Sequence, residues 1–371
     1  MQEDGQASYP SLVPEHFPPI EWDGPEPSPE QIELGRWLFY DQRLSRDGTR
    51  SCGICHEQQK AFTDGLVRGI GLQGASLPFN SLSLANVAWR SELTWSSRIS
   101  DIETHMLVPL LGEDPPEMGM DPELVEERLG ECGYCQEMFG AAFPHDESPA
   151  SMQNAVSSIA AFTRTIVSGG SAYDGWLLGD ESLGAAALRG MELFHSDRTN
   201  CSACHGGLFF DRPFQEQTGV DARHGYFNTG LYNVDGEGGY PPGSPGLIEA
   251  TGQPDDMGRF RVPSLRNLSY TYPWMHDGTE LSLESIIDSY ARGGRLLESG
   301  PYPGDGAQNP YKSELVAGFV LSPSEKEDLL AFLDSLNDPG LAVSPSLGSP
   351  FCSGDAESVP GQPCEPRFQL D

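Results

Sequence analysis

Positive charge is scarce in this chain of 371 residues: 22 Lys and Arg stand against 55 Asp and Glu, a formal net charge of −33. An acidic surface of this kind argues against binding to nucleic acid or anionic membranes, because both are polyanions. It favours a basic protein partner or simply a well-solvated surface, and composition leaves both open.

Long hydrophobic runs are missing as well. No stretch approaches the ~20 consecutive apolar residues of a membrane-spanning helix, and the mean hydropathy is −0.39. The first four residues (MQED) lack the basic start and apolar segment of a secretory signal peptide. We therefore expect no membrane span, and the sequence reads as a mature form with an added methionine.

The pentapeptide C-x-x-C-H occurs once in each half of the chain. It is the attachment signature of c-type haem: two thiols bond the porphyrin, and the histidine turns beneath the ring to ligate iron. With eight Cys and eight His, composition alone gives about 0.004 such pentapeptides per chain. A redox or zinc pair is the alternative, but we expect two covalent haem groups. Their residues are Cys52, Cys55 and His56, then Cys201, Cys204 and His205.

The other cysteines are even in number: Cys132, Cys135, Cys352 and Cys364. Covalent haem and an even number of remaining cysteines, which can pair as disulfides, fit an oxidising compartment, and we expect the periplasm. Nearest-neighbour pairing joins Cys132 to Cys135 and Cys352 to Cys364. A second metal at Cys132 and Cys135 is the alternative, although no His or Cys pair at zinc spacing lies close by.

The length exceeds what one hydrophobic core usually supports, so two domains are expected. Gly35 and Phe39 precede the first haem motif as Gly190 and Phe194 precede the second, a weak internal repeat. The predicted fold is mainly α with long loops, as two cytochrome-c-like domains that each bind one covalent c-type haem. The expected divisions are an extended arm (1–28), an N-terminal haem domain (29–180), a C-terminal haem domain (181–338) and a Pro/Ser-rich tail (339–371).

Two Ser-Pro pairs, Ser28-Pro29 and Ser322-Pro323, mark helix starts, with serine as N-cap and proline in the first turn. Residues 99–120 read as an acidic, proline-rich segment, 171–180 as a link and 206–258 as loop. Further helices are expected at about 121–130, 150–168, 182–195, 282–291 and 323–336.

Several segments carry a family resemblance: 34–39, 52–56, 116–119, 162–165, 201–205, 260–267 and 275–278, with Trp95 and Arg98. Together they resemble the bacterial di-haem cytochrome c peroxidase/MauG family over about residues 30–336. In that family the N-terminal haem reacts with peroxide and the C-terminal haem is a six-coordinate electron relay. The resemblance implies two haem c groups, a calcium ion and a peroxide-dependent oxidoreductase of the MauG-like or MbnH-like branch.

The resemblance also indicates the sixth ligand of each iron. In MauG-like members the second haem takes a tyrosine from the helix after His-Asp-Gly, and that position is Tyr290. A phenolate favours higher oxidation states of iron, whereas a tyrosine packed on the core is the alternative. His276 and Asp277 of that motif are expected to be structural. Residues 77–80 (LPFN) lack the displaceable histidine of other members, so the first haem is expected to be open at rest.

In the distal pocket, the family's glutamate matches Glu117, which we assign as general acid/base in peroxide cleavage. Pro109 matches a pocket-shaping proline, and Trp95 matches the tryptophan between the haems, although a lone Trp more often packs in a core. His105 stands where the family usually has glutamine. It assists proton transfer, the role we favour, or it ligates iron and closes the site, or it is structural.

Calcium would be held by the Asn86 side chain and the backbone carbonyls of Thr271 and Pro273, hard oxygen donors that suit this ion. Near the first motif, Arg43 and Arg46 are candidates to pair with haem propionates. Two solvated surface arginines are the alternative.

Three functions follow. The first is a MauG- or MbnH-like enzyme that uses hydrogen peroxide to form high-valent iron and oxidises Trp or Tyr of a partner protein by long-range electron transfer. The second is a peroxidase that draws electrons from a small redox protein, for which the acidic charge suits a basic donor. The third is a non-enzymatic di-haem electron carrier. Tyr290 and the missing histidine favour the first.

Overall fold

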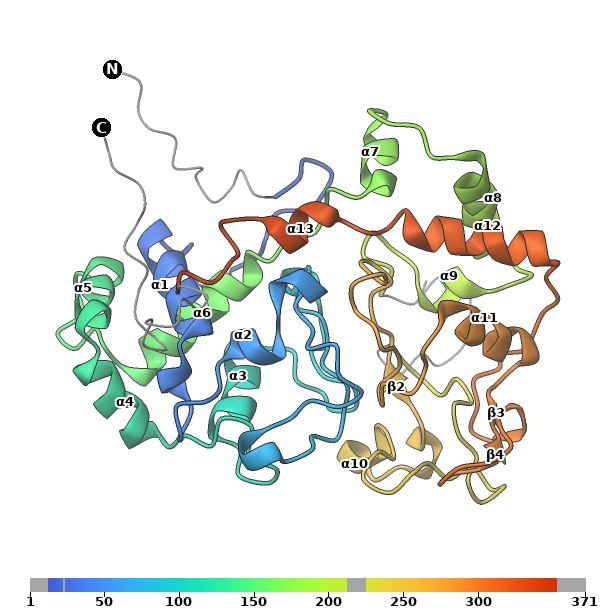
Figure 1. Ribbon diagram of the computed structural model, residues 1–371, viewed down its shortest axis with the longest axis horizontal. Coiled ribbons are helices and arrows are strands. Elements are labelled where there is room, and N and C mark those ends of the chain that lie inside the picture. Colours follow the sequence, from blue (N-terminus) through green and yellow to red (C-terminus); the bar gives the residue numbers. More distant parts are fainter. Residues whose placement is uncertain (1–12, 23, 212–224, 352–371) are drawn as a thin grey trace, which may run out of the picture.

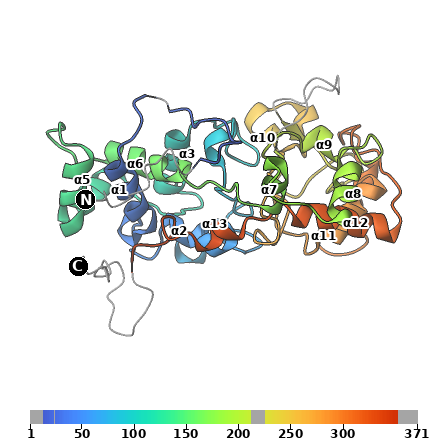
Figure 2. The same cartoon turned by 90° about the horizontal axis from the view of Figure 1, so that it is seen from above.

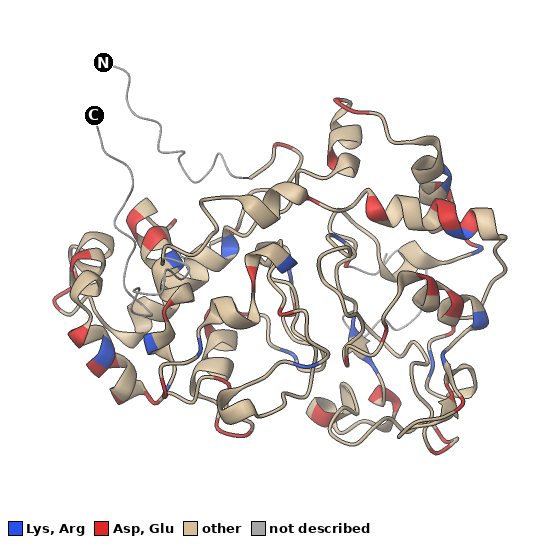
Figure 3. Cartoon of the chain, in the orientation of Figure 1, with Lys and Arg blue, Asp and Glu red and all other residues tan. Residues whose placement is uncertain are grey.

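The computed structural model describes residues 13–22, 24–211 and 225–351. Two lobes of helices and long loops lie side by side along the long axis of the molecule (Figures 1 and 2). The strands in the described ranges are two residues long and form two antiparallel pairs. The predicted mainly α fold class is therefore confirmed. Acidic residues lie on helices of both lobes (Figure 3).

The N-terminal lobe contains α1 (Pro29–Tyr40), α2 (Cys52–Cys55), α3 (Ile102–Leu111), α4 (Pro122–Glu131), α5 (Gly133–Ala142) and α6 (Met152–Arg164). The chain passes through α7 (Ala172–Leu178) into the C-terminal lobe, which contains α8 (Ala185–Phe194), α9 (Cys201–Cys204), α10 (Ile248–Thr251), α11 (Leu283–Arg292) and α12 (Pro323–Asp334). There β1 (Tyr226–Phe227) pairs with β2 (Phe260–Arg261), and β3 (Leu296–Leu297) with β4 (Gly304–Asp305). The last helix is α13 (Pro339–Val343). No helix of the described residues is long and apolar enough to cross a membrane.

Both Ser-Pro pairs begin helices as predicted. The hydroxyl of Ser28 accepts the backbone N–H of Gln31 at 3.1 Å and so caps α1. Ser322 and Glu325 form a reciprocal capping box at the start of α12. The helices predicted at 121–130, 150–168, 182–195 and 282–291 appear as α4, α6, α8 and α11, with small shifts of their ends.

Helices α3, α5 and α7 and the short helices α2, α9, α10 and α13 lie where no helix was predicted, and α10 interrupts the segment 206–258 that reads as loop. Helix α3 begins inside the segment that reads as acidic and proline-rich, where Asp101 accepts the N–H of Thr104 at 2.6 Å. Its second half is apolar on every side and contains Pro109. Such a run lacks the 3.6-residue alternation that identifies a half-buried helix.

The two lobes repeat one helix crossing. A Cβ on Gly35 of α1 would lie 1.8 Å from the backbone oxygen of Ser158 in α6. A Cβ on Gly190 of α8 would lie 1.9 Å from the backbone oxygen of Asp328 in α12. Only glycine permits helices to cross this closely, because it has no side chain.

Matching phenylalanines pack beside these crossings. The rings of Phe39 and Phe162 have centroids 5.3 Å apart, and those of Phe194 and Phe332 lie 5.2 Å apart. All four side chains are buried in the cores of their lobes. The internal repeat predicted from the sequence therefore corresponds to a repeated packing unit just before each haem motif.

The described part of the expected tail packs back on the N-terminal lobe. Leu341 and Leu347 belong to its hydrophobic core, and the Gln58 side-chain amide donates to the Leu341 oxygen at 3.0 Å. Tyr40 donates its hydroxyl to the Leu347 oxygen at 2.7 Å. In Figure 1, α13 accordingly leads from α12 back toward α1. Residues 352–371, with the predicted Cys352–Cys364 pair, lie outside the described residues.

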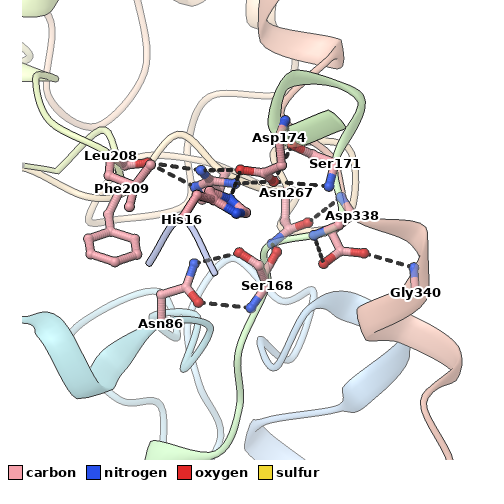
Figure 4. Close-up of polar contacts among 12 residues, drawn as sticks. His16, Asn86, Ser168, Ser171, Asp174, Leu208, Phe209, Asn267, Asp338 and Gly340 are labelled. Carbon is pink, nitrogen blue, oxygen red and sulfur yellow. Dashed lines mark hydrogen bonds and ion pairs between the residues drawn. The ribbon is translucent and has the colours of Figure 1, made fainter. Parts of the chain in front are cut away.

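A buried amide network joins the lobes (Figure 4). Asn86 donates to the Ser168 backbone oxygen at 2.9 Å and accepts the Ser168 N–H at 2.8 Å. Asn267 donates to the Ser168 hydroxyl at 2.8 Å and accepts the N–H of Asp338 at 2.8 Å. Segments from both lobes and from the C-terminal strap, residues 338–351, thus share one set of hydrogen bonds.

The N-terminal arm covers the same junction (Figure 4). His16 Nε2 lies 3.0 Å from Asp174, whose two oxygens also accept from the Arg266 guanidinium at 2.8 and 2.9 Å. Arg266 lies 5.4 Å from the ring centroid of Phe17. The arm therefore contributes a hydrogen bond and an aromatic contact to the lobe interface.

Elsewhere, Cys132, at the junction of α4 and α5, forms a disulfide with Cys135 in the first turn of α5, which confirms that predicted pairing.

Candidate haem-binding site

The first haem motif forms α2, a single turn that ends at His56. His56 Nδ1 lies 2.8 Å from the backbone oxygen of Phe62. Because a carbonyl oxygen only accepts, Nδ1 carries the proton and the lone pair of Nε2 is available to a metal. Burial lowers the pKa of His56, which keeps the imidazole in the neutral form that ligates iron.

The second motif repeats this arrangement on α9. His205 Nδ1 lies 3.1 Å from the backbone oxygen of Phe210, and burial lowers the pKa of His205 too. Phe62 and Phe210 both have positive φ, 62° and 54°. The two loops therefore turn back on their histidines in the same way and fix the same tautomer.

The four motif cysteines are unpaired in the structure. Burial raises the pKa of Cys52 to about 12, of Cys55 to about 11 and of Cys204 to about 12, and it raises the pKa of Cys201 as well. A reactive redox thiol needs a lowered pKa instead. The cluster of three potential metal ligands found among the described residues contains neither motif, so zinc is not favoured either.

A cavity in the C-terminal lobe is lined by His205, by both cysteines of its motif and by one face of α11. From α11 come Leu283, Ile286, Ile287 and Tyr290. Their i, i+3, i+4, i+7 spacing puts them on one side of the helix. The cavity thus combines two thiols, an imidazole, a phenol and an apolar wall, a donor set that fits a covalent haem.

Thr229 lines the same cavity as Tyr290. Burial raises the pKa of Tyr290, and the nearby motif thiols raise it further. In these surroundings the phenol keeps its proton until a cation such as iron approaches. The structure places Tyr290 at the cavity that holds His205, where the sequence predicts the sixth ligand.

Two buried arginines at this cavity were missed by the sequence analysis. Arg90 and Arg261 both line it, and Arg90 Nε lies 3.5 Å from Asp211. Arg90 Nε and Arg261 Nη2 are buried without a hydrogen-bond partner among the described residues. Unpaired buried N–H groups are costly, and haem propionates would satisfy them. The two arginines are far apart in sequence, so no local pattern marks them.

Arg43 and Arg46, which the sequence suggests as partners of haem propionates, have other surroundings. Arg43 pairs with Asp41 at 2.8 Å and lies 4.8 Å from the ring centroid of Tyr134. Arg46 is exposed. Arg43 is thus already paired with a carboxylate of this chain, and Arg46 fits the surface alternative.

Helix α3 brings His105 near His56, and the loop after it brings Glu117 near both cysteines of the first motif. His105 and Pro109 are four residues apart on α3 and share a face. Pro109 accepts the N–H of Met118 at 3.0 Å, which fastens the loop of Glu117 to this helix. Burial raises the pKa of Glu117. Burial lowers the pKa of His105 to about 4.

Trp95 lies at the junction of the lobes. Its indole N–H donates to the Asn80 oxygen at 2.8 Å, and its side chain lines the cavity of His205. It packs in a buried aromatic cluster with Tyr240 and Phe260. Trp95 therefore touches both the loop after the first motif and the second haem cavity.

The predicted calcium ligands lie near the same junction. Thr271 and Pro273 line the cavity, and the Asn86 amide oxygen accepts the N–H of Ser168. An amide oxygen has a second lone pair, so calcium at these residues stays a prediction.

His276 and Asp277 are buried, with 4% and 2% exposure. The His276 ring stacks on Phe260 with centroids 3.5 Å apart. Asp277 accepts the hydroxyl of Tyr232 at 2.5 Å. These are packing and hydrogen-bond contacts of the kind expected for a structural role.

Comparison with known proteins also indicates a di-haem protein of the peroxidase type. The family model described as di-haem cytochrome c peroxidase matches residues 29–182. Methylamine utilization protein MauG of Methylorubrum extorquens is 34% identical over 322 residues, which cover 86% of this chain and 82% of that protein. Cytochrome-c peroxidase IdrP1 of Pseudomonas sp. strain SCT is 32% identical over 362 residues, which cover 92% and 89%.

Among solved structures, a MauG-like protein associated with microbial copper homeostasis is 42% identical, with a TM-score of 0.86 and coverage of 91% of this chain and 98% of that one. The diheme peroxidase BthA from Burkholderia thailandensis shares the fold at a TM-score of 0.64 and 20% identity, with coverage of 87% and 90%. With relatives of 32–42% identity along most of its length, the chain belongs to the di-haem cytochrome c peroxidase/MauG family, and it is a peroxidase-family oxidoreductase with two c-type haems.

Proposed function

We propose that this protein reacts with hydrogen peroxide without prior reduction and oxidises a tryptophan or tyrosine of a partner protein, in the manner of a MauG- or MbnH-like enzyme. The observation that carries the proposal is the placement of Tyr290 at the cavity of His205. Two protein ligands would make the second iron six-coordinate, and a phenolate lowers its reduction potential relative to a thioether. A low potential favours the higher oxidation states that such an oxidation requires.

An open first haem is supported by the loop at residues 77–80. Its backbone is fastened by hydrogen bonds from Leu77 N–H to the Gly69 oxygen at 2.8 Å and from Gly69 N–H to the Phe79 oxygen at 3.1 Å. The Asn80 side chain donates to the Leu66 oxygen at 2.6 Å. No histidine stands in this loop, so it offers the iron no imidazole.

Bound haem supplies the iron that accepts peroxide, and the protein supplies the proton transfers. Glu117 takes the proton from the near peroxide oxygen and delivers it to the far one. Its raised pKa suits a carboxyl group that must both accept and return a proton. His105, neutral above pH about 4, hydrogen-bonds in the pocket and assists this transfer, while Pro109 shapes the wall.

Trp95 is the proposed electron route between the two haem sites, since it contacts the cavity of His205 and is anchored to Asn80. Calcium bound by Asn86, Thr271 and Pro273 would stabilise this junction.

The proposed compartment is the periplasm. The disulfide Cys132–Cys135 and covalent haem both suit an oxidising environment. The copper-homeostasis association of the 42% identical relative makes a partner in metal handling the first to test. With a net charge of −33, the partner's docking face should be basic.

The test is low-temperature EPR of the resting di-ferric protein, followed by stoichiometric hydrogen peroxide without a reductant. We expect one high-spin and one low-spin ferric signal, both of which disappear on addition of peroxide. Two low-spin signals, with no reaction until one haem is reduced, would contradict the proposal and identify His105 as the first ligand to suspect.

The second candidate is a peroxidase that takes electrons from a small redox protein. The 32% identity to cytochrome-c peroxidase IdrP1 and the acidic charge favour it. Steady-state oxidation of a reduced basic cytochrome c at a rate that falls steeply with salt would support this candidate. Membership of a peroxidase family argues against the third candidate, an electron carrier without enzyme activity.

A further inference from the structure

A series of aromatic rings begins at Trp95 and continues into the C-terminal lobe. The His276 ring contacts both Trp95 and Tyr240, with centroids 6.4 and 6.3 Å away. Trp95 and Tyr240 also belong to one buried cluster. A route for electrons into the lobe therefore starts at the tryptophan proposed to connect the haems.

Two more tyrosines extend the series toward the surface. Tyr240 and Tyr232 have centroids 5.6 Å apart, and Tyr232 and Tyr302 6.3 Å apart, both edge to face. Tyr302 is half-buried on the exposed turn between β3 and β4. In Figure 1 this hairpin lies at the outer edge of the C-terminal lobe, while β2 lies near the middle of the molecule.

Tyr232 has a proton acceptor in place. Its hydroxyl donates to Asp277 Oδ2 at 2.5 Å, and Asp277 Oδ1 accepts the hydroxyl of Thr279 at 2.8 Å. Burial raises the pKa of Asp277, but His276 and these hydroxyl donors outweigh it and hold the pKa below its ordinary value. Asp277 is therefore a carboxylate at neutral pH and has a lone pair directed at the phenol proton.

Arg295 lies over the ring of Tyr232, with its guanidinium carbon 4.5 Å from the centroid. A fixed cation there disfavours a positively charged ring. Loss of an electron from Tyr232 is therefore favourable only when the phenol proton leaves with it, and Asp277 is the group that can take it.

We propose that Tyr232 is a redox-active tyrosine that carries oxidising equivalents from the haem region to Tyr302 at the protein surface. One electron leaves Tyr232 toward Trp95 and the haems, its phenol proton moves to Asp277, and a neutral tyrosyl radical remains. An electron that enters through Tyr302 and the return of the proton restore the phenol. Hydrogen peroxide is the oxidant, so this inference rests on the proposed function and adds the exit route.

The experiment uses the full-length protein with both haems. Stoichiometric hydrogen peroxide is added, and samples frozen after increasing times are examined by EPR for an organic radical and for the ferric haem signals. Protein labelled with ring-deuterated tyrosine identifies a tyrosyl radical by its narrower hyperfine pattern. The variants are Tyr232→Phe, Asp277→Asn and Tyr302→Phe.

The matched control is Tyr173→Phe. Tyr173 packs against Phe210 and Phe332 in the other core of the same lobe, with centroids 5.4 and 6.0 Å away, and is not in the ring series. Unchanged resting haem spectra in each variant establish that it has folded.

We expect a tyrosyl signal in the wild type and in Tyr173→Phe, its loss in Tyr232→Phe and its strong reduction in Asp277→Asn. Tyr302→Phe, which changes only a half-buried residue, should keep the signal and prolong its lifetime. If the haem signals respond to peroxide but the radical persists in Tyr232→Phe or never forms, the relay is wrong and the proposed function stands. If the haem signals ignore peroxide, both are overturned.

Discussion

Gly35 of α1 lies against Ser158 of α6 so closely that a Cβ on the glycine would be 1.8 Å from the serine backbone oxygen. Real Cβ atoms do not approach a carbonyl to this distance, so a side chain at Gly35 would push the two helices apart. The first haem motif, in α2, is the next α-helix along the chain after α1, which makes this crossing part of the support of the haem site.

Gly35→Ala should therefore destabilise the protein by about 1–3 kcal/mol, the usual cost of overpacking a core. Denaturant unfolding of the holoprotein measures it. The matched control is Gly130→Ala in α4, where nothing lies within 4 Å of the added Cβ. There, better helix propensity should stabilise by up to about 1 kcal/mol. Equal effects of the two substitutions would show that the close crossing does not matter.

Replacing Tyr290 should change the second haem alone. Tyr290→Met exchanges the proposed phenolate for a thioether, so the reduction potential should rise by some tenths of a volt, within the roughly 0.8 V that axial ligands span. Spectropotentiometric titration measures it. Tyr173→Phe should leave both potentials unchanged. A potential unaffected by Tyr290→Met would assign Tyr290 to packing.

Glu117→Gln should slow the reaction with hydrogen peroxide by about 10²–10⁴-fold, the usual contribution of a general acid/base. The rate constant, measured by stopped flow, should in the wild type fall as pH drops through the Glu117 pKa, because the protonated carboxyl cannot accept the peroxide proton. That pKa lies above the ordinary value of a glutamate. Glu113→Gln, at an exposed position in the same loop, should keep both the wild-type rate and its fall at low pH.

His105→Gln restores the residue type that the family usually has at this position. If His105 acts in the pocket, the resting high-spin signal should stay, and the peroxide rate should fall by roughly tenfold, less than in Glu117→Gln. Because its pKa lies at about 4, His105 should add no titration step between pH 6 and 8. A low-spin signal that becomes high-spin in His105→Gln would instead show that His105 ligates iron.

Asn86→Ala separates calcium binding from hydrogen bonding. The side chain makes two buried hydrogen bonds to Ser168, so its loss should cost about 1–3 kcal/mol of stability even in the presence of a chelator. Thermal unfolding in the presence of calcium and of a chelator measures the contribution of the hydrogen bonds and that of calcium binding separately. A cost that vanishes in chelator would make Asn86 a calcium ligand only, and no effect of calcium on the wild type would refute the calcium site.

Local signals predicted much of the structure. The Ser-Pro pairs marked the starts of α1 and α12, and the two haem motifs identified His56 and His205, which the structure places at the ends of α2 and α9. Each of these signals is contained in a few consecutive residues, so a single sequence reveals it.

Non-local contacts were the part that could not be predicted. Arg90 of the N-terminal lobe and Arg261 of the C-terminal lobe line the same cavity. A lone arginine has no periodic pattern that distinguishes it from a surface residue. Helix α3 was missed because its apolar run has no 3.6-residue alternation, although it carries two of the proposed distal residues, His105 and Pro109.

The return of residues 338–351 to the N-terminal lobe affects how the chain is made. Gln58, two residues after the first haem histidine, donates hydrogen bonds to Leu341 and Ser344, and Leu341 and Leu347 complete the same core. A chain that emerges from its N-terminus therefore completes its second lobe before its first. The lobe that is synthesised first can therefore complete its core only after residues 338–351 are in place.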